Sequence, residues 1–231
     1  MLEKIIELDK SIFYFLNGLH SPTFDVAMSL FTRAELWGAF FIAIIICIGR
    51  TFGRKSLGVF LALGLIVLIA DQGSGLVKEW AGRLRPTHDP SMQGLVHYVI
   101  KRGGKLSYFS AHAANTFGVA MFLSLLFKNR TFSIIVFSWA AIASYTRIYL
   151  GLHFPADILT GITFGLLIGW GMFRLVGYLD RRFFGLTSSR VSKTMLSVQQ
   201  SQTILLVFIM TILMVILVAN RLLHTGLIAN Y

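Results

Sequence analysis

The chain has 231 residues, of which 55% are hydrophobic and only 13% are charged. The charged share is about half of that in ordinary globular domains, so the composition is typical of an integral membrane protein. The single cysteine, Cys47, excludes an internal disulfide and a thiolate metal cluster. The net charge of +11 comes without a basic stripe or a nucleic-acid-binding motif. It therefore favours anionic lipid headgroups or phosphate over nucleic acid as the partner.

Residues 1–31 are predicted to form an amphipathic segment at the membrane surface. Along residues 2–20, apolar side chains recur at helical spacing and polar side chains occupy the other side. The apolar positions are Leu2, Ile5, Ile6, Ile12, Phe13, Leu16 and Leu19, and the polar ones are Glu3, Lys4, Glu7, Lys10, Ser11 and Asn17. This pattern predicts a helix that lies in the interface instead of crossing the bilayer. His20-Ser21-Pro22 ends the helix, and a second apolar piece follows at 24–31.

The remaining sequence predicts an all-α, polytopic membrane helix bundle that forms a single domain over residues 1–231. Six apolar stretches are expected to cross the membrane: 36–49, 56–77, 113–127, 131–145, 155–178 and 203–220. The first five form a catalytic core over 36–178. A polar linker over 179–202, with Arg181, Arg182, Arg190 and Lys193, separates them from the sixth. In the fifth span Gly161, Gly165 and Gly169 form a small-residue stripe, which allows membrane helices to approach closely.

Six crossings place three polar segments on one side of the membrane: the one after the second span, the one before the third, and the link between the fourth and fifth. The short basic loops at 50–55, 128–130 and 181–193 fall on the opposite side. Positive charge in short loops marks the cytoplasmic side. We therefore expect a bacterial inner-membrane protein whose polar cluster faces outward.

The segment after the second span supplies cations. Lys78 and Arg85 are seven residues apart, a spacing that places them on one face of a continuing helix. One interpretation is an interfacial anchor of basic residues beside Trp80. The other is a phosphate clamp, in which Arg85 grips two oxygens and Lys78 acts as a point charge.

Two further segments carry polar groups to the same side. Ser110, Ala111 and His112 open the third span, where a hydroxyl group and free backbone N–H groups can bind an anion. Arg147, His153 and Asp157 lie within eleven residues before the fifth span. If helix continued through Pro155, His153 and Asp157 would share a face, and the carboxylate would orient the imidazole as a nucleophile or base. Alternatively, His112 is an ordinary interfacial residue and Asp157 only caps a helix.

A metal site built from His112, His153 and Asp157 is a competing interpretation. Three cations aimed at the same place, Lys78, Arg85 and Arg147, would repel a divalent ion and suit a doubly negative phosphate. We therefore expect no metal and no cofactor.

These residues resemble the three-part signature of the type 2 phosphatidic acid phosphatase superfamily: Lys78-x6-Arg85-Pro86, then Ser110-Ala111-His112, then Arg147-x5-His153-x3-Asp157. The resemblance spans residues 78–157. Two departures are visible. The middle motif begins Phe109-Ser110-Ala111 where the family usually has Pro-Ser-Gly, and the third begins with Thr146 where it usually has serine.

The resemblance implies a metal-independent membrane lipid phosphatase. His153 would attack phosphorus and form a phosphohistidine, Asp157 would orient it, and His112 would protonate the leaving oxygen and then activate water. Lys78, Arg85, Ser110, Ala111 and Arg147 would bind the phosphate oxygens. The resemblance leaves the lipid open among a polyprenyl diphosphate, a lipid A phosphate, phosphatidylglycerol phosphate and phosphatidate. A phosphotransferase and a non-catalytic lipid-binding or flipping protein are the alternatives.

The sequence leaves the roles of several other polar residues open. Asp71 lies inside the second span, where a carboxylate needs a partner, which is either Lys78 or another buried polar group. His88 and His97 lie in the loop over 87–107, which is expected on the outer side, and both are expected to be solvated. Lys101, Arg102 and Lys105 attract an anionic headgroup or form a solvated loop.

Overall fold

The computed structural model describes residues 2–100, 103–183 and 196–225. Within them all regular elements are helical, apart from one isolated bridge between Leu84 and Leu106. The α-helices are α1 (Leu2–Asn17), α2 (Pro22–Phe31), α3 (Gly38–Phe52), α4 (Ser56–Ala81), α5 (Ala111–Phe127), α6 (Arg130–Tyr149), α7 (Pro155–Phe183) and α9 (Val198–His224). Short 3₁₀ turns are η1 (Ala34–Trp37), η2 (Gly53–Lys55), η3 (Pro86–His88) and η4 (Pro90–Met92). The predicted all-α fold is confirmed.

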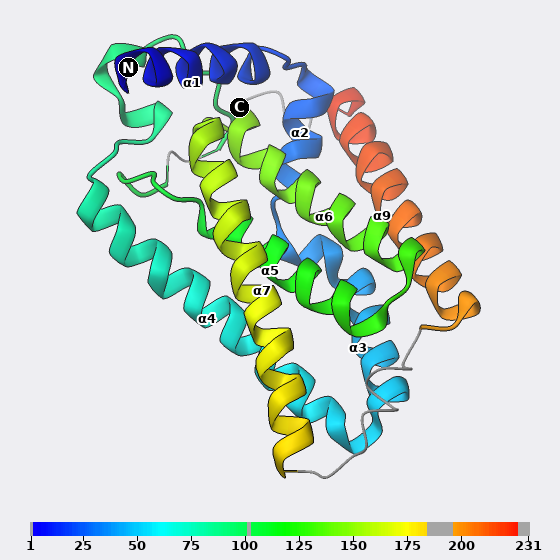
Figure 1. The fold of residues 1–231 in the computed structure, drawn as a ribbon. Helices are drawn as coiled ribbons and strands as arrows, with labels where there is room; N and C mark the ends of the chain where they lie inside the picture. The colour runs from blue at the N-terminus through cyan, green and yellow to red at the C-terminus, as the bar shows by residue number, and fades with distance from the viewer. Residues whose placement is uncertain (1, 101–102, 184–195, 226–231) are drawn as a thin grey trace.

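Each predicted span coincides with a helix from α3 to α9, and most of the helices extend a few residues further than predicted. Four helical stretches are long and apolar enough to cross a membrane: Ala34–Ala81, Arg130–Tyr149, Pro155–Arg182 and Val198–His224. The first of them contains both α3 and α4, which the η2 turn joins into a hairpin (Figure 1). The remaining span, α5, is a shorter apolar helix of 17 residues. A count of six crossings stays a prediction.

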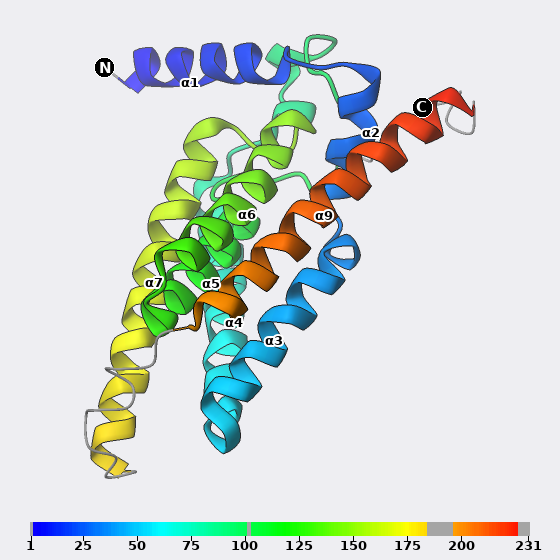
Figure 2. The ribbon, with the colours of Figure 1, turned by 90° about the vertical axis from the view of Figure 1, so that its right-hand side faces the viewer.

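Helix α1 lies across one end of the bundle, and the long helices run away from it toward the other end (Figures 1 and 2). Its contact with the bundle is a stripe of Asp9, Phe13 and Asn17, all of which are buried. A second face of the same helix leaves Leu8 and Phe15 exposed. A helix that docks on protein with one face and exposes apolar side chains on another fits the predicted interfacial position.

The small-residue stripe of α7 packs directly on α5. A Cβ at Gly161 would lie 2.5 Å from the carbonyl oxygen of Ser110, and one at Gly165 would lie 2.4 Å from that of Ala114. The two backbones therefore touch, as expected of small-residue packing in membranes. This contact fixes the N-terminal end of α7 against the N-terminal end of α5.

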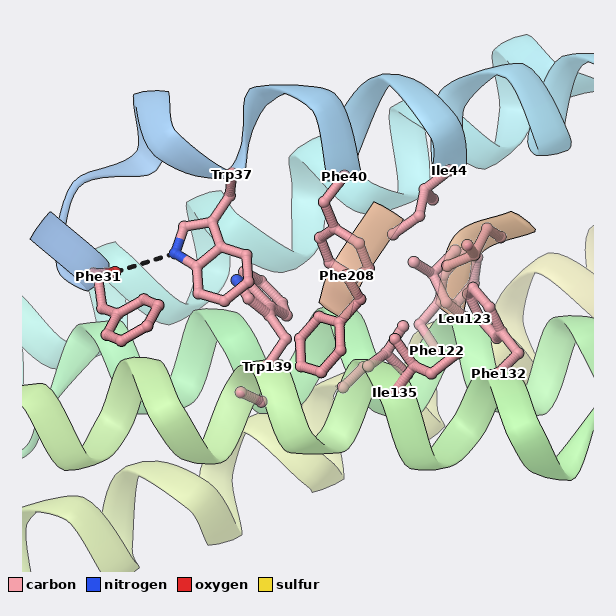
Figure 3. Close-up of a cluster of buried hydrophobic side chains, with 14 of the residues drawn as sticks. Phe31, Trp37, Phe40, Ile44, Phe122, Leu123, Phe132, Ile135, Trp139 and Phe208 are labelled. Atoms are coloured by element: carbon pink, nitrogen blue, oxygen red, sulfur yellow. Dashed lines mark hydrogen bonds between the residues drawn. The ribbon is translucent and has the colours of Figure 1, made fainter. Parts of the chain in front are cut away.

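An aromatic core holds the rest of the bundle together (Figure 3). Trp37 stacks near Phe31 of α2 and Phe208 of α9, and its indole N–H donates to the Phe31 carbonyl oxygen at 2.9 Å. Ala27 and Met28 of α2 are buried in the same cluster. Helix α2 thus packs between α6 and α9 instead of lying on the surface with α1, because its apolar side meets these aromatic rings.

The polar segments of the predicted site and the short basic turns lie at opposite ends of the bundle, as expected. The C-terminal ends of α4 and α6 and the N-terminal ends of α5 and α7 lie on the α1 side (Figure 1). Lys55 and Asp180 form a salt bridge of 3.1 Å at the other end, beside the basic turns. Both ends of the linker predicted over 179–202 are helical, because α7 continues to Phe183 and α9 already begins at Val198. Arg190 and Lys193 lie outside the described residues, as do Lys101 and Arg102.

Candidate active site

Arg85 is held by a short pairing between two loops. Helix α4 ends at Ala81, where Gly82 adopts a left-handed φ of 59°. The Arg85 backbone N–H then donates to the Lys105 carbonyl oxygen, and its Nε donates to that of Leu106, both at 3.1 Å. The prediction that Lys78 and Arg85 share a helix face was therefore wrong, because glycine ends the helix between them. Gly103 lies so close that a Cβ there would be 2.5 Å from Arg85 Nη1.

The start of α5 is built as expected for an anion-binding helix end. Ser110 is the N-cap residue, and its hydroxyl accepts a long hydrogen bond from the Ala113 N–H. Ala111 is the first helical residue, so its N–H has no carbonyl partner within the helix. Among the described non-glycine residues only Lys128 has positive φ, so alanine fits at 111 without strain. His112 follows on the exposed side of the helix.

The pair His153 and Asp157 forms through a turn and not along a helix. Helix α6 ends at Tyr149, Gly151 has a φ of 69°, and α7 begins only at Pro155. The His153 N–H donates to the carbonyl oxygen of Arg147 at 3.2 Å, which folds the turn back over α6. His153 Nδ1 lies 3.4 Å from Asp157 Oδ2, with 2% and 0% of the two side chains exposed.

Asp157 also caps its own helix, in addition to its contact with His153. Its Oδ2 accepts from the Phe154 N–H at 2.9 Å and from the hydroxyl of Ser107. Its Oδ1 accepts from Arg83 Nη1 at 2.9 Å. A carboxylate with this many donors stays ionised and fixed in direction. It can therefore hold the proton of His153 on Nδ1 and leave Nε2 with a free lone pair.

Burial lowers the pKa of His153 to about 4. The positive charges of Arg85 and Arg147 act in the same direction, whereas the hydrogen bond and the charge of Asp157 oppose them. The imidazole is thus neutral at physiological pH, which is the form in which it can act as a nucleophile.

Arg147 is the most buried of the cations. Only 9% of its surface is exposed, one Nη donates to the hydroxyl of Thr32, and its buried Nε has no hydrogen-bond partner. An unpaired N–H of a buried guanidinium is costly unless a ligand completes it. A phosphate oxygen is the kind of acceptor that this N–H lacks.

The predicted site residues converge although they come from four helices and their loops. Electrostatic interactions link Lys78 with Arg85, Arg147 and Asp157, and link His112 with Arg147, His153, Lys78 and Arg85. The structure thus brings together both histidines, the carboxylate and all three cations. Ser110 joins them through its backbone N–H, which donates to the Asp157 carbonyl oxygen at 3.1 Å.

Three residues of this region were missed by the sequence reasoning. Arg83 bridges Asp157 to Asp9 of α1, and its guanidinium lies 4.0 Å over the ring of Phe154. Asp9 also accepts from the Ala156 N–H at 2.8 Å. Ser107 contacts Asp157 and lies 3.3 Å from His153 Nδ1. The available signal for Asp9 was a carboxylate on the helical face that also carries Phe13 and Asn17.

The structure shows the partners of Asp71 and His97, whose surroundings the sequence left open. Asp71 accepts from Asn115 Nδ2 at 2.9 Å and also interacts electrostatically with Lys78. His97 is not simply solvated: its Nε2 lies 2.7 Å from Asp25, and its ring stacks on His20 at 3.8 Å. The rings pack because the link between α1 and α2 meets the loop that carries His97. In the part of the chain that the structure describes, no three His, Cys, Asp or Glu side chains form a possible metal site.

The chain is similar to known membrane phosphatases. A family profile described as the PAP2 superfamily matches residues 55–181. The lipid A 4'-phosphatase of Bacteroides thetaiotaomicron is 36% identical over 186 residues, which cover 79% of this chain and 83% of that protein. The lipid A 4'-phosphatase of Porphyromonas gingivalis is 33% identical over 80% of this chain and 79% of its own length.

A solved structure supports the fold. The crystal structure of Aquifex aeolicus LpxE superposes with a TM-score of 0.59 at 23% identity, covering 72% of this chain and 95% of that one. At this identity the likeness concerns the arrangement of the helices.

Proposed function

The chain belongs to the PAP2 superfamily, and from this premise we propose that it hydrolyses the phosphate ester of a lipid A-type glycolipid through a phosphohistidine intermediate. The family and the two relatives identify it as a membrane lipid phosphatase. The substrate and the intermediate are the proposed parts. The choice of substrate is supported by the two lipid A 4'-phosphatases, each of which aligns over about four fifths of the chain.

The observation that carries the proposal is the environment of His153. This histidine is buried and neutral, its Nδ1 faces the Asp157 carboxylate, and two guanidinium groups lie within electrostatic range. A site that only bound an anion would gain more from a protonated imidazole. A neutral, oriented imidazole beside phosphate-binding cations fits nucleophilic catalysis.

In the first step His153 Nε2 attacks phosphorus, and the bond from phosphorus to the lipid oxygen breaks. His112, on the open side of the site, gives a proton to the departing oxygen. In the second step His112 takes a proton from water, whose oxygen attacks phosphorus. The bond from phosphorus to nitrogen breaks, and inorganic phosphate leaves while Asp157 keeps the imidazole in its original orientation.

The remaining site residues stabilise the charge on the transferring phosphoryl group. Lys78, Arg85 and Arg147 supply three positive charges, and the Ser110 hydroxyl and the Ala111 N–H supply neutral donors at a helix start. Phosphoryl transfer depends mostly on such positioning and on charge stabilisation. The three cations provide the charge that a divalent ion provides in other phosphotransfer enzymes.

We place the protein in a bacterial inner membrane with the site facing outward. Lys128, Arg130, Arg181 and Arg182 lie at the bundle end opposite to α1, and short basic loops favour the cytoplasm. Reaction of a membrane-impermeant thiol reagent with Ser91→Cys but not with Ser56→Cys in intact spheroplasts would support this orientation. The reverse pattern would contradict it.

The direct test is release of phosphate from purified lipid A by the full-length protein in mixed micelles containing EDTA. Release that is retained in EDTA and lost in His153→Ala supports the proposal. Appearance of a phosphorylated acceptor without free phosphate would identify a phosphotransferase instead. Binding of unchanged lipid A would contradict both.

A further inference from the structure

Below the catalytic residues, one face of α4 and one face of α5 continue toward the middle of the bundle. On α4, Lys78 is followed at helical spacing by Asp71 and then by Phe60. On α5, His112 is followed by Asn115 and then by Val119. Phe60 and Val119 both line a cavity of about 230 Å³ between α3, α4, α5 and α6, and all residues around this cavity are apolar. The two helix faces thus connect the phosphate site with this apolar cavity.

Asp71 and Asn115 lie between these two environments. Asn115 is three residues beyond His112, and Asp71 is seven residues below Lys78, or about 4.5 and 10 Å along the helix axes. Asp71 is exposed on a helix that is otherwise strongly apolar. A carboxylate at such a position is costly and usually serves a function.

The hydrogen bond between the two side chains fixes what they offer to a ligand. Asp71 can only accept, so Asn115 must turn its amide nitrogen toward it, at 2.9 Å. The amide oxygen of Asn115 then points away, and it is buried without a hydrogen-bond partner. Asp71 Oδ2 likewise accepts no hydrogen bond from the residues that the structure describes. The pair therefore presents two acceptors and needs donors.

We propose that Asp71 and Asn115 select lipids that carry hydroxyl or amide N–H donors next to the phosphate ester. This inference rests on the proposed function and narrows its substrate class. N-acylated sugars and other amide-linked lipids have such donors between the phosphate and the hydrocarbon chains. Phosphatidate has only ester oxygens there, and polyprenyl phosphates have hydrocarbon. Both leave the two acceptors unpaired, which is costly for the buried amide oxygen of Asn115.

The test compares ceramide 1-phosphate with phosphatidate of matched chain length, each as substrate of the full-length enzyme in the same mixed micelles. Both are phosphate monoesters with two chains, but only the ceramide has a hydroxyl and an amide N–H near the phosphate. We expect wild-type kcat/KM to favour ceramide 1-phosphate by about tenfold or more. Asp71→Asn, which turns an acceptor into a donor, and Asn115→Leu should each bring this ratio close to one.

Gln72→Leu is the matched control, because Gln72 is the exposed polar neighbour of Asp71 on α4 and faces away from it. It should keep the wild-type ratio. Equal kcat/KM for the two lipids in the wild type, or an unchanged ratio in both Asp71→Asn and Asn115→Leu, would overturn the inference while leaving the phosphatase activity in place. Absence of phosphate release from these lipids and from lipid A would overturn the proposed function and this inference with it.

Discussion

The two histidines of the site differ sharply in their surroundings. His153 is 2% exposed and is enclosed by Asp157, Ser107 and the turn after α6. His112 is exposed on the first turn of α5, at helical spacing from Asn115 and from Val119, which lines the apolar cavity. In the proposed mechanism the enclosed half, His153 with its neighbours, attacks phosphorus, and the open half, His112, meets the leaving group and water. This contrast shows that the structure fixes the side chain of His153 and leaves that of His112 accessible.

The largest expected effect comes from the enclosed half. His153→Ala should lower kcat/KM for phosphate release by about 10⁴-fold or more, because no other group can replace the nucleophile. Malachite-green detection of phosphate from lipid A measures it. The loss should be equally large with a nitrophenyl phosphate lipid analogue, since attack is required for either leaving group. A residual rate within a factor of 100 of wild type would show that His153 is not the nucleophile.

His112→Ala tests the open half and should cost about 10²–10⁴-fold with a natural lipid, the usual contribution of a general acid. With the nitrophenyl analogue the loss in kcat/KM, measured as nitrophenolate release, should be much smaller, because nitrophenolate departs without a proton. Its kcat should still fall, because hydrolysis of the phosphohistidine needs His112 as the base. The same pair of substrates thus separates the two histidines. An equal loss of kcat/KM with both substrates would contradict the assignment of His112 as the acid.

Arg83→Ala should lower kcat/KM by roughly 10–100-fold, the usual cost of losing a group that orients a functional ligand. Asp9→Asn should cost about fivefold or less, because one partly exposed ion pair contributes about 1 kcal/mol. Lys10→Ala is the matched control, since Lys10 ties the same helix to Asp89 and Ser91 without contacting the site. If Lys10→Ala reduces activity as much as Asp9→Asn, the effect comes from docking of α1 in general. The ion pair between Asp9 and Arg83 would then have no specific role.

The contact that joins the two halves is the packing of α7 on α5. Gly165→Ala would place a Cβ 2.4 Å from the Ala114 carbonyl oxygen and should destabilise the protein by about 1–3 kcal/mol. Gly171→Ala, on the same helix with no atom within 4 Å of its Cβ, should leave the melting temperature unchanged. Thermal unfolding in one detergent at a fixed scan rate compares the two variants. Equal melting temperatures would contradict the close backbone packing.

The smallest expected effect is a shift in pH dependence. The pKa of His153 is about 4, so its neutral form persists as pH falls until about that value, and protonation then removes the nucleophile. On the acid side of the pH profile (the acid limb), the fall of kcat/KM should therefore have its midpoint near this pKa. Arg85→Gln removes a positive charge that lowers the pKa, so the acid limb should move upward by a fraction of a unit to about one unit. The ionisation of the substrate is the same for both enzymes, so an unmoved limb would contradict the role of His153.

The sequence predicted the features that depend on local patterns. Hydropathy places a helix at every expected span. Motif spacing selected His112, His153 and Asp157 as candidates, because short polar segments in an apolar chain stand out, and the structure brings the three together. The sequence reasoning was wrong about the shared helix face of Lys78 and Arg85, where Gly82 ends α4. A single left-handed residue decides such an end, and the periodicity alone does not reveal it.

The supporting contacts were not predictable, because they join residues that lie far apart in the chain. Arg83 and Asp157 are 74 positions apart, and Asp9 and Ala156 are 147 apart. Asp71 was recognised as needing a partner, but only the packing of α4 against α5 identifies Asn115 as that partner. Hydropathy describes which side chains avoid water, whereas polar pairing between helices depends on their relative rotation.

The enclosed half can be tested most directly by trapping its intermediate. His112→Ala protein, mixed with the nitrophenyl analogue carrying ³²P and quenched in alkali, should retain label on His153, because departure is easy and activation of water is lost. The bond should be stable in alkali and labile in acid, and peptide mapping should assign it to His153. Absence of labelled protein while nitrophenol is released, or label that persists after His153→Ala, would contradict a phosphohistidine at this position.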